Sequence, residues 1–228
     1  MLFRKIKGVT IVFSICAVFA LVAAQIQYFS AAHSSANTIS YIIDPGHGIP
    51  DGGAVGTDGT TEQELNLSIS LKLSKKLKKR GFPNVLTRSD ENSIYTEGET
   101  IHEKKVSDIR QRIQIANDYS SVPLISIHMN TFPSQSVKGI QVFYSSKNEQ
   151  SMKLAQKMQN SLNENFQPQN PRVIKPIPNN IYLFSHIENP SVIIECGFIS
   201  NDNELKLLKD GRYQENLAET IAAVLTNS

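Results

Sequence analysis

The chain has 228 residues, of which 40% are hydrophobic and 19% are charged, with 12 Gly and 10 Pro. This composition is typical of a globular protein and excludes the collagen-like, coiled-coil and disordered classes. The two cysteines, Cys16 and Cys196, cannot build a disulfide framework. The length fits one domain of about 190 residues with a terminal appendage better than two full domains.

The first 36 residues are typical of an export segment. Three basic residues within the first seven precede an apolar run over 9–24, as in a secretory signal. Apolar and aromatic residues after this run could extend it into an uncleaved anchor, so cleavage stays open. We therefore expect residues 1–36 to be a signal peptide or N-terminal membrane anchor. Residues 37–228 would form the folded domain outside the membrane, which the protein would touch only through the first segment.

The charge of the chain is concentrated in this export segment. Three of the 23 basic residues and none of the 21 acidic residues lie in residues 1–36. The remaining residues therefore carry 20 basic against 21 acidic side chains and are nearly neutral. A balance of this kind argues against nucleic acid as a partner and is compatible with secretion.

The folded part begins with a strand, a loop and a helix. The apolar run 39–43 predicts a strand, and the sequence Asp-Pro-Gly-His-Gly over 44–48 predicts that the chain then leaves the sheet. Thr61 and Glu64 have the spacing of a capping box, which predicts a helix with Thr61 as its N-cap. Leucine and isoleucine at steps of four, at positions 65, 69, 73 and 77, continue this helix.

The rest of the chain alternates between short apolar runs and longer helical patterns. Further strands are predicted over 82–87, 123–127, 139–144 and 191–196. Further helices are predicted over 106–117, 148–166, 202–209 and 213–226. The run 191–196 is almost continuously apolar, as expected for a strand in the middle of a sheet. The alternation predicts an α/β fold: a single domain with a mostly parallel central sheet and helices on both faces.

Four polar residues stand at the ends of these elements or interrupt them. His47 and His128 each follow a predicted strand, and Glu62 opens the first helix. Because ligands of open α/β sheets bind beyond the carboxyl ends of the strands, these three side chains could converge. Two imidazoles and one carboxylate are a usual ligand set for catalytic zinc, with a fourth position left for water. In isolation, Glu62 could equally be a favourable charge at a helix N-terminus.

Glu195 interrupts the apolar run of the last predicted strand. A carboxylate there is costly unless a metal, a charge or a substrate offsets it. A zinc hydrolase also needs a carboxylate that does not bind the metal and moves protons instead. Glu195 is the candidate for this role. The neighbouring Cys196 is more typical of a small apolar core residue than of a nucleophile.

The polar motifs together resemble a known family. Five segments match, in order and spacing, those of the zinc-dependent N-acetylmuramoyl-L-alanine amidases of the amidase-3 family: 44–48, 51–54, 62–67, 126–130 and 195–201. The resemblance covers residues 39–226. It implies that His47, Glu62 and His128 bind zinc and that Glu195 is the catalytic glutamate. Gln63 departs from the lysine that the family often has there, which makes Glu64 an alternative ligand, but the position at the helix start and the register of Asn66 and Leu67 favour Glu62.

Within the family, the chain is most similar to the germination-specific amidases of spore-forming bacteria. The segments that carry this similarity are 108–112, 133–135, 180–183 and 213–215. It implies cleavage of the amide between N-acetylmuramic acid and L-alanine in spore-cortex peptidoglycan, as a step toward muramic-δ-lactam. The enzyme would be extracytoplasmic, either secreted or anchored at the membrane. A chain of this length leaves room for an accessory protein that positions or activates it.

Two other functions remain open from the residues alone. An extracytoplasmic zinc carboxypeptidase would use the same ligand types to cut another bond of the stem peptide. A catalytically silent wall-binding protein would have lost a ligand or Glu195, whereas this sequence retains all four residues. The bond that is cut distinguishes the first alternative from an amidase.

Overall fold

The computed structural model describes residues 38–167 and 169–227, so the expected signal peptide or anchor lies outside the described residues. The strands are β1 (Tyr41–Pro45), β2 (Asn84–Leu86), β3 (Leu124–Asn130), β4 (Gln141–Tyr144), β5 (Lys175–Pro176) and β6 (Ser191–Phe198). The helices are α2 (Glu62–Lys79), α3 (Ile101–Asp118), α4 (Glu149–Phe166), α5 (Tyr182–Ser185), α6 (Asp202–Lys209) and α7 (Gly211–Thr226). None of the described helices is long and apolar enough to cross a membrane.

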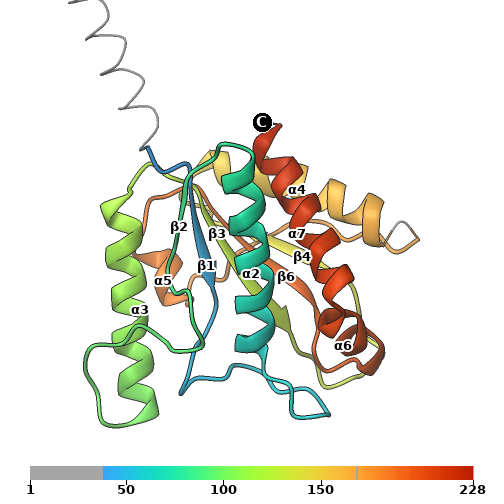
Figure 1. Cartoon of the computed structure of the whole chain (residues 1–228), viewed down its shortest axis with the longest axis horizontal. Helices are drawn as coiled ribbons and strands as arrows, with labels where there is room; N and C mark the ends of the chain where they lie inside the picture. Colours follow the sequence, from blue (N-terminus) through green and yellow to red (C-terminus); the bar gives the residue numbers. More distant parts are fainter. Residues whose placement is uncertain (1–37, 168, 228) are drawn as a thin grey trace, which may run out of the picture. The chain divides into compact units, whose positions relative to one another are not determined.

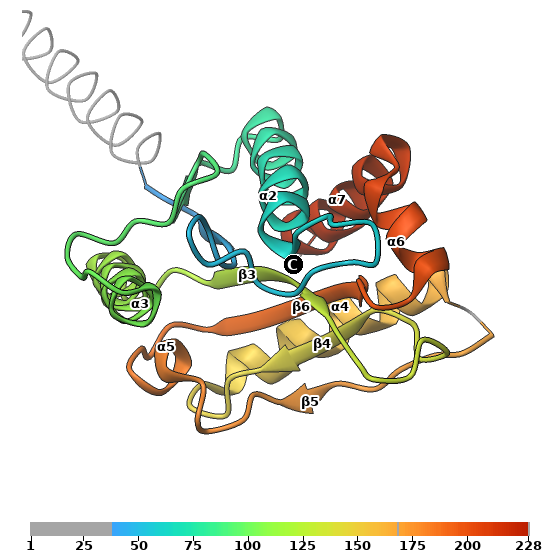
Figure 2. The same cartoon turned by 90° about the horizontal axis from the view of Figure 1, so that it is seen from below.

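One six-stranded sheet organises the domain, in the order β2-β1-β3-β6-β4-β5. The first four strands in this order are parallel, whereas β4 runs antiparallel to β6 and parallel to β5. Figure 2 shows β3, β6, β4 and β5 following one another across the sheet. The prediction of a mostly parallel sheet is confirmed, and β6, the strand with the apolar run, lies inside the sheet with neighbours on both sides.

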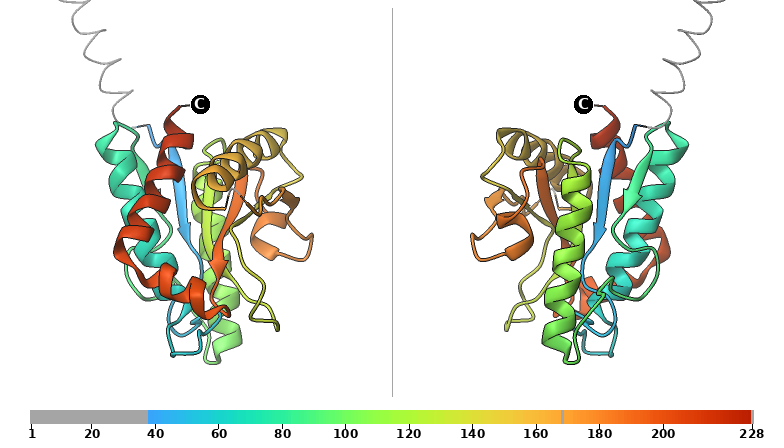
Figure 3. Two further views of the ribbon diagram at one scale, coloured as in Figure 1. Left: turned by 90° about the vertical axis from the view of Figure 1, so that its right-hand side faces the viewer. Right: turned by 90° about the vertical axis from the view of Figure 1, so that its left-hand side faces the viewer.

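Helices cover both faces of the sheet, as predicted. On one face, a large apolar core joins the sheet to α2, α4, α6 and α7 and includes Leu65, Ile69, Leu73 and Leu77 of α2. On the other face, a smaller core joins Ile42, Leu124 and Ile193 of the sheet to α3 and α5. In both views of Figure 3 the strands β1, β3 and β6 lie between α2 and α5. Cys196 is fully buried in the larger core and is a packing residue, as expected.

The structure differs from the sequence predictions at short or irregular elements. Strand β1 continues through Pro45 because it still pairs with Ile127 of β3 there, after β2 has ended. Helix α3 begins five residues before the predicted start at Val106, at Ile101, where Thr100 and Glu103 form a capping box. The two-residue strand β5 and the four-residue helix α5 were not predicted, because elements this short have no measurable periodicity.

The fold gathers chain segments at the carboxyl edge of the parallel strands. β1 and β3 both end at this edge, and α2 begins there (Figure 1). In β3 and β6, His128 lies directly opposite Glu195. Residues that are far apart in the sequence therefore meet where ligands of open α/β sheets bind.

Candidate active site

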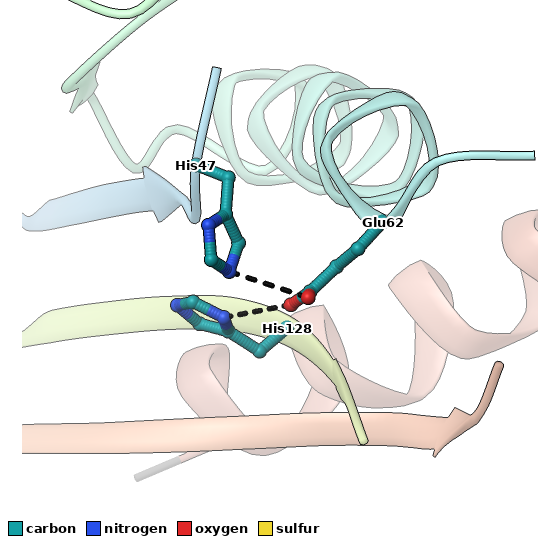
Figure 4. Close-up of side chains that lie close together, drawn as sticks. All are labelled: His47, Glu62 and His128. Carbon is teal, nitrogen blue, oxygen red and sulfur yellow. Dashed lines mark hydrogen bonds and ion pairs between the residues drawn. The ribbon is translucent and has the colours of Figure 1, made fainter. Parts of the chain in front are cut away.

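His47, Glu62 and His128 converge at this edge. Nε2 of His47 lies 3.2 Å from Oε2 of Glu62, and Nδ1 of His128 lies 2.9 Å from Oε1 of Glu62. Figure 4 shows both imidazoles facing the carboxylate, which projects from the first residue of α2. The three donor atoms lie within 4.8 Å of one another and form a group that could hold a metal ion.

The local structure of α2 decides between Glu62 and Glu64. Glu64 is exposed, and its carboxylate accepts a hydrogen bond of 3.3 Å from the Thr61 backbone N–H at the N-cap. Glu62 is buried and also accepts hydrogen bonds from the backbone N–H groups of Ala54 (2.9 Å) and Met129 (3.1 Å). Glu62 is thus fixed toward the two histidines, while Glu64 caps the helix.

Two glycines leave space for the candidate ligands. A Cβ atom at Gly46 would lie 2.2 Å from the His128 ring, and one at Gly53 would lie 2.6 Å from the Glu62 carboxylate. Gly53 also has a φ of 70°, which L side chains rarely adopt. The close approach of backbone and ligand side chains explains why glycine is required at these two positions.

His47 has an unusual backbone conformation, and a second carboxylate contacts its ring. Its φ of 61° is the only positive value at a described non-glycine residue, and such backbone strain is concentrated at functional sites. Oδ2 of Asp51 lies 2.9 Å from Nδ1 of His47, which leaves Nε2 facing Glu62. A carboxylate on the distal nitrogen fixes the orientation of a ligand histidine and raises its basicity.

A buried charge cluster supports the loop that carries His47. Asp44 accepts hydrogen bonds from Thr87 and Ser126, each at 2.6 Å, and pairs with Arg112 of α3. Arg112 in turn donates to the His47 carbonyl oxygen at 2.7 Å. Asp44 makes these contacts with Thr87, Ser126 and Arg112 and not with the ring of a candidate ligand histidine. Its contacts are those of a structural brace, and Asp51 is the residue that bonds the histidine ring.

Electrostatics couple the three candidate ligands. Burial lowers the pKa of His47, but hydrogen bonds to Asp51 and Glu62 outweigh it and raise the pKa to about 9. Burial raises the pKa of Glu62, yet the hydrogen bonds and charges of His128 and His47 outweigh it and hold that pKa well below its ordinary value. The ionised Glu62 carboxylate next to two imidazole nitrogens favours a cation at this position.

Glu195 stands beside this group without joining it. It lies in β6 opposite His128, and its Oε2 atom is shielded from solvent without a hydrogen-bond partner among the described residues. Burial raises the pKa of Glu195 to about 7, with the charge of Glu62 adding to the effect and His128 and His47 opposing it. A carboxyl group with a pKa near neutral can both accept and donate a proton, as a general acid–base catalyst must.

A cavity of about 420 Å³ opens next to the candidate site. His47, His128 and Glu195 line one end of it, and residues of α3 and α5 line its sides. This volume lies in the usual range of small-ligand sites, about 300–1,000 Å³. All three of these side chains are therefore accessible to a substrate that enters the cavity.

The four residues predicted from the sequence are thus brought together, and the structure adds others. Asp51 and the supporting Arg88 were not predicted to contribute. Arg88 donates hydrogen bonds to the carbonyl oxygens of Gly46 and Gln63, each at 2.9 Å. Asp51 follows His47 by only four residues, and this spacing could have indicated that its carboxylate contacts the histidine. No pattern around Arg88 indicated its buried position.

Comparisons with known proteins agree with this site. A family model described as N-acetylmuramoyl-L-alanine amidase, amidase-3, matches residues 42–227. The germination-specific N-acetylmuramoyl-L-alanine amidase of Bacillus subtilis is 36% identical over 180 residues, which cover 78% of this chain and 75% of that protein. The amidase LytC of the same organism is 30% identical over 78% of this chain and 33% of its own length.

Solved structures show the same fold. The CwlD amidase from Clostridioides difficile, determined in complex with the GerS lipoprotein, has a TM-score of 0.78 and 36% identity, covering 82% of this chain and 96% of that chain. An N-acetylmuramoyl-L-alanine amidase from Clostridium difficile 630 has a TM-score of 0.71 and 30% identity, covering 84% and 96%. The chain belongs to the amidase-3 family of N-acetylmuramoyl-L-alanine amidases, zinc-dependent enzymes that act on peptidoglycan.

Proposed function

We propose that the chain uses zinc to hydrolyse the amide between N-acetylmuramic acid and L-alanine, with His47, Glu62 and His128 as metal ligands and Glu195 as the catalytic residue. The observation that carries this proposal is the unpaired Glu195 carboxyl opposite His128, beside three converging donor atoms. Two imidazole nitrogens and one carboxylate oxygen are a donor set that would hold zinc, and His47 and His128 line the adjoining cavity that a substrate would enter.

Each residue of the site has a chemical role in this reaction. Zinc held here supplies a Lewis acid, which polarises a carbonyl group and lowers the pKa of water. Asp51 orients His47 through Nδ1, and the backbone N–H groups of Ala54 and Met129 hold the Glu62 carboxylate in place. Glu195 accepts the proton of the attacking water as the C–O bond forms. It then donates that proton to the alanine nitrogen as the C–N bond breaks.

We extend the proposal to the substrate and the compartment. The likeness to a germination-specific amidase and to CwlD supports a role in spore-cortex peptidoglycan, as a step toward muramic-δ-lactam. The enzyme would act outside the cytoplasmic membrane, after export by residues 1–36. The solved complex of CwlD with the GerS lipoprotein supports an accessory protein for this chain as well.

Substitution of Glu195 by Gln tests the proton-transfer role. Glu195→Gln keeps the size of the side chain but cannot carry the proton, so we expect zinc content and folding to be retained. Hydrolysis should fall by about 10²- to 10⁴-fold. Glu64→Gln is the matched control, because Glu64 is exposed and lies outside the site; it should keep wild-type activity. Normal hydrolysis by Glu195→Gln would show that another group carries the proton.

Mass spectrometry of the digestion products identifies the bond. An amidase releases intact stem peptides and leaves muramic acid with a free lactyl carboxylate. Release of a terminal amino acid would instead identify a carboxypeptidase. The cortex role is measured separately, because spores that lack the enzyme should contain no muramic-δ-lactam.

A further inference from the structure

The cavity beside the site has walls of a distinct chemical character. Ile109 of α3, Leu183 of α5, the neighbouring Ile181 and Ile193 of β6 form an apolar part of its lining, and polar side chains such as Asp108 and Asn180 line the rest. α3 and α5 belong to the same apolar core on this face of the sheet, and Figure 2 shows them on one side of β3 and β6. Sugar rings carry many hydroxyl groups that need hydrogen-bond partners, which apolar walls do not supply. These walls fit small apolar groups such as an alanine methyl.

The position of Glu195 indicates which half of the substrate enters this cavity. If Glu195 donates a proton to the departing amine, the alanine nitrogen must lie within hydrogen-bond reach of its carboxyl group. Glu195 lines the cavity together with Ile193 of the same strand. With the alanine nitrogen at Glu195 and the stem peptide in this cavity, the chain that continues from that nitrogen would run between α3 and α5, and the glycan would lie on the other side of the scissile bond.

Two cations line the cavity, Arg112 and Lys105, and they differ in how many of their donors the protein already occupies. Arg112 is buried and its three nitrogens donate to Asp44, Asp108 and nearby carbonyl oxygens. Lys105 of α3 is 45% exposed, and its Nζ lies 2.8 Å from Oδ2 of Asp51. An ammonium group has three donors, so this ion pair leaves Lys105 with donors that can point into the cavity.

We propose that the cavity between α3 and α5 receives the stem peptide and that Lys105 binds a carboxylate of the residue that follows L-alanine. This inference rests on the proposed amidase function. It assigns the stem peptide to the cavity and the glycan to the other side of the scissile bond. Lys105 is a substrate-binding residue in this proposal. Lys105 and Asp51 both line the cavity, and the Asp51 carboxylate contacts the Lys105 ammonium and the His47 ring.

Two peptidoglycan fragments with the same glycan test the assignment. One carries the stem L-alanyl-D-glutamate, and in the other both glutamate carboxylates are carboxamides. A hydrogen bond to a charged group contributes about 1.5–3 kcal/mol, so the wild type should have a KM at least about tenfold lower for the first fragment. In Lys105→Gln this difference should disappear, because the KM for the carboxylate fragment rises to that for the carboxamide fragment.

Lys104→Gln is the matched control. Lys104 directly precedes Lys105 in α3, but its ammonium lies over the Tyr95 ring and it is not one of the residues that line the cavity. This variant should keep the full preference for the carboxylate fragment. The proposal is overturned if Lys105→Gln keeps the preference. It is equally overturned if kcat falls by the same factor for both fragments while zinc content drops, since Lys105 would then act only through Asp51 and His47. Failure of the wild type to cut either fragment or intact peptidoglycan at the muramoyl–alanine bond would instead refute the proposed function.

Discussion

The buried carboxylate of Asp44 should make the stability of the domain depend on pH in the acid range. Burial raises the pKa of Asp44, but the charge of Arg112 and hydrogen bonds from Ser126 and Thr87 outweigh it and lower the pKa from 3.8 to about 2. The folded state therefore prefers the ionised form. Asp44→Asn removes the charge and keeps the shape, so it imitates the protonated carboxyl at every pH.

The magnitude follows from the two pKa values. A difference of one pKa unit corresponds to about 1.4 kcal/mol, so the shift from 3.8 to about 2 contributes about 2–3 kcal/mol to the free energy of unfolding. Because the folded pKa is the lower one, this contribution is fully present above the unfolded pKa. It is lost as the pH falls from about 4 toward 2.

Urea unfolding of the wild type and of Asp44→Asn between pH 7 and pH 2.5 measures this effect. The free energies of unfolding should differ by about 2–3 kcal/mol at neutral pH and converge as the solution is acidified. Asp58→Asn is the control: Asp58 pairs with Lys209 at the exposed surface, where such pairs contribute little. A difference between the wild type and Asp44→Asn that stayed constant down to pH 2.5 would refute the role given to the Asp44 charge.

Two further predictions concern the candidate ligands. Gly46→Ala places a Cβ atom 2.2 Å from the His128 ring and should abolish zinc binding, whereas Gly52→Ala, whose nearest neighbour would be at 3.5 Å, should bind zinc normally. Equal zinc content in both variants would contradict the close approach. Asp51→Ala removes the partner of His47 Nδ1 and should weaken zinc affinity by about 10–100-fold in competition with a chelator; unchanged affinity would show that His47 needs no such support.

Local sequence was informative about the site because its chemistry restricts residue types. Two histidines and two carboxylates, placed at the ends of predicted elements or within an apolar run, are recognisable along the chain. The choice between Glu62 and Glu64 was present in the capping box, because a glutamate at the third helical position bonds back to the N-cap and cannot also face the site. The contacts of both residues agree with this expectation.

Elements with weak local signals depended on tertiary structure. The strand 141–144 was predicted, but nothing in its sequence indicated that it runs antiparallel to β6. Strand β5 and helix α5 are held by long-range packing, such as that of Leu183 and Phe184 against the smaller core. Their residues carry no periodicity from which either element could be predicted.

The sequence by itself determined the fold class, the order of the main elements and the four residues with which the proposed chemistry would be carried out. Periodicity and side-chain chemistry are local properties, and they can be read along the chain. Only the tertiary structure decided that Asp51 meets His47 and that Lys105 lines the same cavity as His47, His128 and Glu195. These relations depend on how α3, α5 and the sheet pack in space, and no local pattern encodes the distance between side chains on separate elements.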